Sequence, residues 1–156
     1  MTEIDIKLTR YGSRVASELT AAALADLGER YGSSEGDSTP IEPGEFDPPA
    51  GAFFVAYVGG APAGCGGFRT FAEDETTAEL KRMYVAPGYR GLGVAKALLR
   101  AIEDAARAAG RKRVWLETGT AQPEAIGLYE RSGYARIEDF GHYKGYELVR
   151  SFGRDL

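Results

Sequence analysis

The chain has 156 residues, of which 44% are hydrophobic and 27% are charged, the composition of an ordinary globular protein. The net charge of -4 disfavours a nucleic-acid partner, and no apolar run approaches the roughly 20 residues of a membrane span. The first seven residues lack the apolar core of a signal peptide, and the single cysteine excludes an internal disulfide. We therefore predict one cytoplasmic domain over residues 1–156, without membrane or nucleic-acid partners.

The N-terminal third predicts a strand, a helix and a long polar loop. Residues 4–8 alternate apolar and polar side chains, and residues 12–30 repeat apolar side chains at helical spacing. Residues 32–51 are rich in Ser, Gly and Pro and contain no Lys or Arg. The acids of this loop are Glu35, Asp37, Glu42, Glu45 and Asp47. The loop is either a solvated connection or a negative surface that attracts a cationic substrate.

The middle of the chain predicts three adjacent antiparallel strands. Residues 52–58 and 63–68 are apolar and are joined through a Gly-Gly pair, which favours a tight hairpin. A polar turn leads into the third strand at 78–86. Cys65 lies between glycines in the second strand, so we interpret it as a small buried residue and not as a nucleophile.

A glycine-rich loop and an amphipathic helix follow the third strand. The loop is Pro87-Gly-Tyr-Arg-Gly-Leu-Gly93, and apolar residues recur at helical spacing from Ala95 to Ala109. A helix start carries unpaired N–H groups and the positive end of the helix dipole, and glycine lets an anion approach closely. With Arg90 and Lys96 on either side, the loop predicts a pocket for a phosphate or pyrophosphate.

The strand that follows this helix completes a strand–helix–strand unit. On the exposed face of the helix we expect an ion pair between Glu103 and Arg107. Gly110 is expected to end the helix in the left-handed conformation. A right-handed crossover then places the strand 114–118 parallel to the strand 78–86.

The C-terminal part predicts a short helix and two strands. Pro123 suits the first position of a helix that Gly133 closes. Residues 134–137 and 146–152 predict strands. The loop between them holds His142, the single histidine, which we interpret as an ordinary loop or rim residue. We expect no metal site.

The glycine-rich loop alone leaves alternatives open. A dinucleotide-binding turn requires G-x-G-x-x-G directly after its strand, but Lys96 occupies the third glycine position. The P-loop motif is absent. A plain helix start would use the glycines only to turn.

A family resemblance adds to these observations. Arg90-Gly-Leu-Gly-Val-Ala95 matches R/Q-x-x-G-x-G/A and resembles the acetyl-CoA pyrophosphate loop of the GNAT superfamily of N-acetyltransferases. Val114-Trp-Leu-Glu-Thr118 follows, and Ala125-Ile-Gly-Leu-Tyr-Glu-Arg-Ser-Gly-Tyr134 resembles the family segment A-x-x-L-Y-E-x-x-G-F. These elements keep the family's order and spacing from about residue 78 to residue 134.

The resemblance implies a mixed α/β fold. A strongly twisted, mostly antiparallel sheet would carry helices on both faces, and the parallel strands 78–86 and 114–118 would splay apart to admit pantetheine. Gln122 stands where the family often has Asn, and it keeps the amide. The residues implied to bind acetyl-CoA, the co-substrate, are Met83, Tyr84, Val85, Arg90, Gly91, Leu92, Gly93, Val94, Ala95, Lys96 and Gln122.

Acetyl transfer requires a neutral amine and benefits from a proton for the departing thiolate. An alkylamine with a pKa near 10.4 is only about one part in a thousand neutral near pH 7.4, which favours a base or a water chain leading to one. The resemblance assigns the base to Glu79 on the strand before the loop, with Glu117 in reserve. Tyr129, the tyrosine of the L-Y-E segment, is implied as the general acid at the CoA sulfur.

The predicted function is transfer of acetyl from acetyl-CoA to a primary amine of a small molecule or peptide, by a monomer or homodimer. Polyamines, aminoglycosides, amino acids and protein N-termini all stay open as acceptors. The main alternative is a non-catalytic acetyl-CoA-binding sensor or regulatory subunit, which would need neither Glu79 nor Tyr129. A dinucleotide-binding oxidoreductase is a more distant alternative.

Overall fold

In the computed structural model, residues 2–33 and 36–156 are described, so Glu35 of the polar loop lies outside the described residues. The strands of this part form one sheet in the order β1-β2-β3-β4-β5-β7-β6. They are β1 (Ile4–Leu8), β2 (Ala52–Val58), β3 (Ala61–Phe71), β4 (Asp74–Val85), β5 (Arg113–Gly119), β6 (Ala135–Arg136) and β7 (Val149–Asp155). The β4–β5 pair is parallel and the other neighbours are antiparallel, which confirms the predicted mixed sheet.

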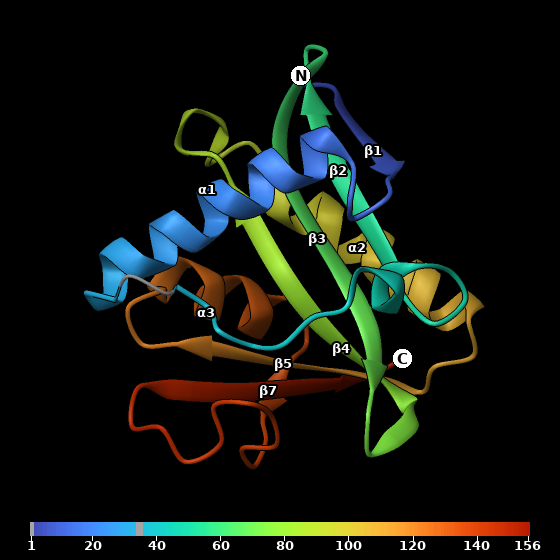
Figure 1. Cartoon of the computed structure of the whole chain (residues 1–156), viewed down its shortest axis with the longest axis vertical. Coiled ribbons are helices and arrows are strands. Elements are labelled where there is room, and N and C mark those ends of the chain that lie inside the picture. Colours follow the sequence, from blue (N-terminus) through green and yellow to red (C-terminus); the bar gives the residue numbers. More distant parts are fainter. Residues whose placement is uncertain (1, 34–35) are drawn as a thin grey trace.

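Helices cover both faces of the sheet, as predicted (Figure 1). They are α1 (Arg14–Tyr31), α2 (Val94–Ala108) and α3 (Pro123–Arg131), with short 3-10 helices η1 (Pro43–Phe46) and η2 (Pro87–Tyr89). Gly110 has a φ of 81°, the left-handed conformation expected at the end of α2. None of the helices in the described residues combines the length and the apolar character that crossing a bilayer requires.

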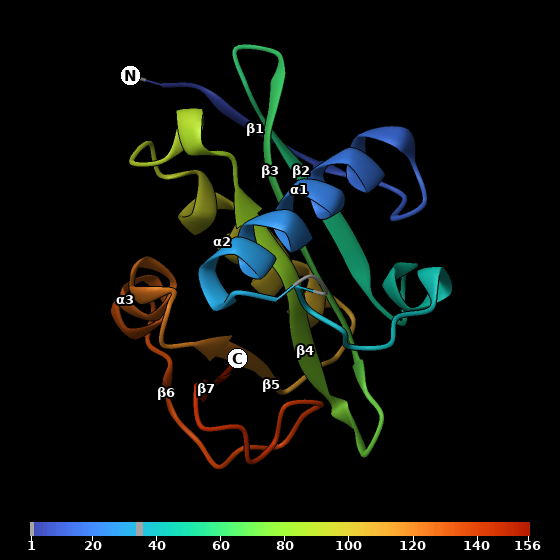
Figure 2. The same cartoon turned by 60° about the vertical axis from the view of Figure 1, so that its left-hand side comes forward.

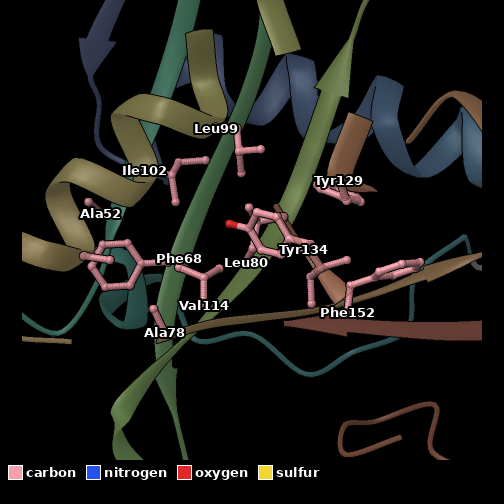
Figure 3. Packing of buried hydrophobic residues seen from close by; sticks show 12 residues of the cluster. Ala52, Phe68, Ala78, Leu80, Leu99, Ile102, Val114, Tyr129, Tyr134 and Phe152 are labelled. Atoms are coloured by element: carbon pink, nitrogen blue, oxygen red, sulfur yellow. The ribbon is translucent and has the colours of Figure 1, made fainter. Parts of the chain in front are cut away.

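The core follows the alternation of side chains along the strands. On one face, α2 and α3 pack on β4 and β5 in a cluster that includes Leu80, Leu99 and Tyr129 (Figure 3). On the other face, α1 and η1 pack on β2 and β3, with Leu19 and Phe53 among the buried residues. Because side chains alternate along β4, the polar side chains of Glu79 and Lys81 point to the second face. They lie under α1 and the loop that follows it.

The C-terminal strands differ from the sequence prediction. The last strand begins at Val149 and not at residue 146, and β6 is only two residues long. The apolar pattern of residues 146–148 misled the prediction, because Tyr146 and Leu148 are 63% and 53% exposed and lie in a loop. This loop, orange to red in Figure 2, borders the sheet beside β5 and β7.

The predicted ion pair of α2 is wrong. Glu103 is only 6% exposed and accepts hydrogen bonds from the Tyr134 hydroxyl at 2.8 Å and the Arg154 guanidinium at 3.2 Å. Arg107 pairs instead with Asp104 at 3.1 Å. Tyr134 and Arg154 come from two later segments, and their hydrogen bonds allow this carboxylate to be buried. The helical spacing alone could not show these partners.

The close packing of β3 predicts an effect on stability. A Cβ at Gly67 would come within 2.8 Å of Phe53 Cδ1 and 3.1 Å of Phe46 Cδ1, whereas a Cβ at Gly12 would have no neighbour within 4 Å. We expect Gly67→Ala to lower the free energy of unfolding by about 1–3 kcal/mol through overpacking. The matched control Gly12→Ala should change it by less than about 0.5 kcal/mol. Urea unfolding of both variants tests this, and equal stabilities would contradict the described packing.

Candidate active site

The site lies where the two parallel strands stop pairing. The β4–β5 ladder ends at Glu79 and Trp115, although β4 continues to Val85 and β5 to Gly119. Beyond that point the strands diverge, as Figure 1 shows, and a cavity of about 460 Å³ lies along the cleft. Residues 80–84 of β4 and the end of β5 form two of its walls, and α1, α3 and residues 143–149 supply the others. The predicted splay is therefore confirmed.

A bend in β4 shapes the cavity wall. Arg82 has a φ of 62° and is the one non-glycine residue in the described part of the chain with a positive φ. The register with β3 shifts at this point. Such a conformation is costly and persists only where surrounding contacts hold it. Here the Arg82 carbonyl accepts a hydrogen bond from Cys65 Sγ at 3.3 Å, and burial raises the pKa of that thiol to about 12. Cys65 is thus a buried thiol, as predicted.

Asp37 anchors the bend through ion pairs. Its Oδ2 lies 3.1 Å from Lys81 Nζ and also contacts the Arg82 guanidinium, and all three side chains are largely buried. Its Oδ1 accepts a hydrogen bond from the Tyr143 hydroxyl at 3.0 Å. Burial opposes ionisation of Asp37, but Lys81 and Arg82, with hydrogen bonds from Thr39, outweigh it and hold the pKa of this carboxyl well below its ordinary value. Both cationic side chains of the cavity therefore share a single counter-charge.

Glu79 lies in a structural ion pair and outside the cavity lining. Its side chain is 3% exposed, and its Oε1 accepts a hydrogen bond from Arg69 Nε at 3.0 Å. Arg69 also donates to Glu45 Oε2 at 2.8 Å, so this guanidinium joins β3, β4 and η1. The hairpin register places Arg69 opposite Glu79, a signal that the sequence contained and that the prediction did not use.

Of the two glutamates considered as the base, Glu117 is the one that lines the cavity. Its Oε2 accepts a hydrogen bond from the Tyr143 N–H at 3.0 Å, while its buried Oε1 has no hydrogen-bond partner among the described residues. Burial, with the nearby charges of Glu79 and Asp37, raises the pKa of this carboxyl. A Cβ at Gly141 would come within 2.6 Å of the carboxylate carbon, so a larger residue there would displace the Glu117 carboxylate.

Tyr129 and Gln122 bring α3 to the cavity. Tyr129 is 3% exposed, and burial raises the pKa of its phenol, which therefore stays protonated at neutral pH. The amide oxygen of Gln122 accepts a hydrogen bond from the Tyr31 hydroxyl at 3.1 Å. That hydroxyl also lies against Gly119, where a Cβ would collide with it. The end of α1 is thus tied to the segment that joins β5 to α3.

The glycine-rich loop has the geometry that an anion site requires. Gly91 and Gly93 have φ values of 80° and 87°, and a Cβ at either position would meet nothing within 4 Å. Gly93 precedes α2 without a side-chain cap, so the first-turn N–H groups remain available. The Arg90 guanidinium donates to the Val85 carbonyl at 3.0 Å and remains partly exposed.

The predicted acetyl-CoA residues fall into two groups around the cavity. Met83 and Tyr84 line it together with Gln122, whereas Val85 and the loop residues 90–96 lie outside its lining, at the start of α2. The arrangement fits a molecule with an anionic end at the helix start and a narrow chain between the strands. Across the described residues, no group of three or more His, Cys, Asp and Glu side chains could hold a metal ion.

The polar loop contributes to the cavity through fewer acids than its composition indicates. Asp37 lines the cavity and is paired, whereas Glu45 holds Arg69, and Glu42 and Asp47 are exposed outside the lining. Of the described part of the loop, Ser33 and residues 36–38 line the cavity. His142 lies on an exposed loop, as predicted, with its Nε2 at 3.2 Å from Ser38 Oγ.

A family model identifies the class of this protein. The model of the Acetyltransferase (GNAT) family matches residues 15–134, from the start of α1 to the end of the α3 segment. The chain belongs to this family, which confirms the resemblance seen in the sequence.

Known proteins agree with this assignment. The chain is 43% identical over 91 residues to a protein named IAA acetyltransferase from Azospirillum brasilense, a match that covers 58% of this chain and 59% of that relative. It thus spans less than two thirds of the relative's length. A Klebsiella pneumoniae structure described as an acyl-CoA N-acyltransferase has a TM-score of 0.80 at 28% identity and covers 98% of this chain and 97% of its own. A GNAT structure from Elizabethkingia anophelis, with acetyl-CoA bound, shares the fold at a TM-score of 0.69 and 18% identity, with 98% of each chain covered.

The buried ion pairs of Asp37 predict a pH-dependent loss of stability. Asp37→Asn leaves Lys81 and Arg82 without their counter-charge, so we expect the free energy of unfolding to fall by about 3 kcal/mol at pH 7. Because the folded-state pKa of Asp37 is lowered, its stabilisation is present above the ordinary carboxyl pKa and is lost as the pH falls below it. Urea unfolding at pH 7 and pH 3 should therefore show a difference that shrinks at pH 3. The exposed Asp47→Asn serves as control, and an equal effect of both variants at pH 7 would contradict the assignment.

Proposed function

We propose that this chain is a single-domain, acetyl-CoA-dependent N-acetyltransferase that acts on a primary amine. The proposal rests on the helix start that follows β4 and on the cavity between β4 and β5. An anion-binding helix start lies at one end of the β4–β5 cleft, and Glu117 and Tyr129 line the cavity in that cleft. Membership of the GNAT family and the acetyl-CoA bound to the Elizabethkingia relative support the same conclusion.

Each part of the acetyl-CoA site would have a distinct task. The N–H groups at the start of α2 would bind the pyrophosphate, with Gly91 and Gly93 keeping side chains away from it. Arg90 would add a positive charge at the same end. The facing edges of β4 and β5 would bind the pantetheine arm, and the free N–H₂ of Gln122 would donate to it.

The transfer moves two protons, one from the amine and one to the departing thiolate, and a different residue would handle each. Acetyl-CoA supplies the activated acetyl group as its thioester. Glu117 would accept the proton of the amine, because it is the cavity carboxylate with an oxygen that lacks a partner and with a raised pKa. Tyr129 would donate a proton toward the departing thiolate. Glu79, held by Arg69, would act on the amine only through a chain of waters.

A non-catalytic acetyl-CoA sensor would need the loop and the cleft but no acid or base. The presence of Glu117 and Tyr129 on the cavity wall favours the enzyme. The acceptor's identity and the oligomeric state do not follow from the family.

The anion site predicts the behaviour of two loop variants. Arg90→Ala removes the charge at the helix start, and Gly93→Val forces a β-branched residue into a left-handed conformation. We expect each to weaken CoA binding by about tenfold or more, measured by titration calorimetry and by the CoA-induced rise in melting temperature. Arg100→Ala, on an exposed position of α2, serves as control. Unchanged CoA affinity in both loop variants would refute the proposed site.

The acid and base predict different pH–rate profiles. Burial raises the pKa of Glu117, so this carboxyl loses its proton, and can act as a base, only at a higher pH than an ordinary carboxyl. Glu117→Gln should lower kcat/KM about 100-fold near pH 7, and the deficit should shrink as the pH rises and more of the amine arrives neutral. Tyr129→Phe should lower kcat by a similar factor of about 100 with CoA binding nearly intact.

The matched control is the second carboxylate. Glu79→Gln should retain most of the wild-type activity at pH 7 and show no pH-dependent deficit, since Glu79 lies outside the cavity lining. If Glu79→Gln shows that deficit and Glu117→Gln does not, the base is Glu79 acting through water. Full activity of both Glu117→Gln and Tyr129→Phe would refute the acid–base mechanism.

A further inference from the structure

We propose that the acceptor is a small cationic amine that carries an apolar, flat group and no carboxylate. This inference rests on the proposed N-acetyltransferase function and specifies its substrate class. Three independent properties of the cavity carry it: the pairing of its charges, the exposed apolar side chains at its wall, and its closure by two loops.

The charge pattern disfavours an anionic acceptor. Lys81 and Arg82 are the cationic side chains among the described cavity residues, and Asp37 pairs with both. Glu117 and Glu147 are the described cavity carboxylates without an ion-pair partner, since Asp26 pairs with Arg30 at 3.0 Å. With Asp26 left out, three carboxylates of the described lining face two cations, and this excess of negative charge favours an ammonium group over a carboxylate of the acceptor.

Exposed apolar side chains lie beside these carboxylates. Tyr146 and Leu148 flank Glu147, line the cavity, and are 63% and 53% exposed. The ring of Tyr146 packs edge to face on Tyr143, with 5.3 Å between the ring centroids. Both rings line the cavity, so they present an aromatic surface to a bound acceptor. An acceptor with an aromatic group would cover these side chains, and its ammonium would reach Glu117 or Glu147.

Hydrogen bonds between two loops restrict the size of the acceptor. The Ser38 N–H donates to the Tyr143 hydroxyl at 2.5 Å, and Ser38 Oγ lies 3.2 Å from His142 Nε2. These contacts join the segment after α1 to the loop before β7 on one side of the cavity. The volume of about 460 Å³ is in the usual range for small-molecule sites. Because these contacts border the cavity on one side and its volume is limited, a free small amine fits it better than the terminus of a folded protein.

The test compares acceptors that differ by one feature each. The purified protein is assayed with acetyl-CoA and with 2-phenylethylamine, ethylamine or phenylalanine. Ethylamine lacks the ring, and phenylalanine adds a carboxylate beside the same amine. We expect kcat/KM for 2-phenylethylamine to exceed that for each of the others by about tenfold or more, the scale of discrimination in an apolar pocket. A peptide with a free N-terminus should react less well than 2-phenylethylamine.

Variants of the cavity wall test whether Tyr146 and Leu148 cause the preference for an aromatic amine. Replacing both Tyr146 and Leu148 with Ser should lower kcat/KM for 2-phenylethylamine about tenfold and leave that for ethylamine nearly unchanged. The control is Leu8→Ser, which changes a 60% exposed leucine of β1 that is outside the cavity lining and should affect neither acceptor.

The outcomes separate this inference from the proposed function. If ethylamine, phenylalanine or the peptide is the better substrate, or if the double variant loses activity equally on 2-phenylethylamine and ethylamine, the inference is overturned while N-acetyl transfer stands. If CoA binds and no amine is acetylated, the proposed function fails and the inference fails with it. Selective loss on 2-phenylethylamine supports both.

Discussion

The early end of the β4–β5 ladder is the constraint on which the rest of this structure depends. Backbone N–H and C=O groups normally require partners, and each strand keeps one neighbour: β4 pairs with β3, and β5 pairs with β7. On their facing edges, however, pairing stops at Glu79 and Trp115. The edges beyond lie open to a ligand, and the bend at Arg82 contributes to that opening. The cavity is thus a consequence of how two strands part, and the loops around it only complete the walls.

Electrostatics within the site follows from the same arrangement. The bend directs Lys81 and Arg82 toward one carboxylate, so these three buried side chains form a single ion-pair cluster. Glu117 lies in a partly desolvated position near this cluster, and burial outweighs the charge of Lys81 and raises the pKa of its carboxyl. A carboxylate in such a position holds a proton more readily than one that is fixed in an ion pair. The difference between Glu79 and Glu117 is therefore one of partners, since both lie on neighbouring strands.

Much of the fold followed from local patterns. Period-two alternation located β1, apolar segments between turns located β2 to β5, and glycines with left-handed conformations marked the loop before α2 and the end of that helix. The parallel pairing of β4 and β5 followed from the handedness of a crossover. These features depend on neighbouring residues in the chain, which is why they could be predicted.

The errors concern contacts between distant segments. Glu103 was expected at the surface because its helical neighbours are charged, but Tyr134 and Arg154 come from later elements and satisfy it. Residues 146–148 were expected in a strand because they are apolar, although they are exposed beside the cavity. In the candidate site, Tyr129 and Gln122 line the cavity, and the proposal of Glu117 as the base depends on Arg69 and Tyr143, which come from other segments. The periodicity of apolar residues along the sequence does not show which partners come from distant segments.

The contact between Tyr31 and Gly119 has a consequence for how this sequence can change over evolutionary time. The Tyr31 hydroxyl occupies the space that any side chain at residue 119 would need, while it also holds the Ala121 N–H and the Gln122 amide. A larger residue at position 119 is tolerable only if position 31 shrinks first, and that first step removes two hydrogen bonds. The two positions are 88 residues apart, and we expect their residues to change together across related sequences. Sequences that keep tyrosine at position 31 should also keep glycine at position 119.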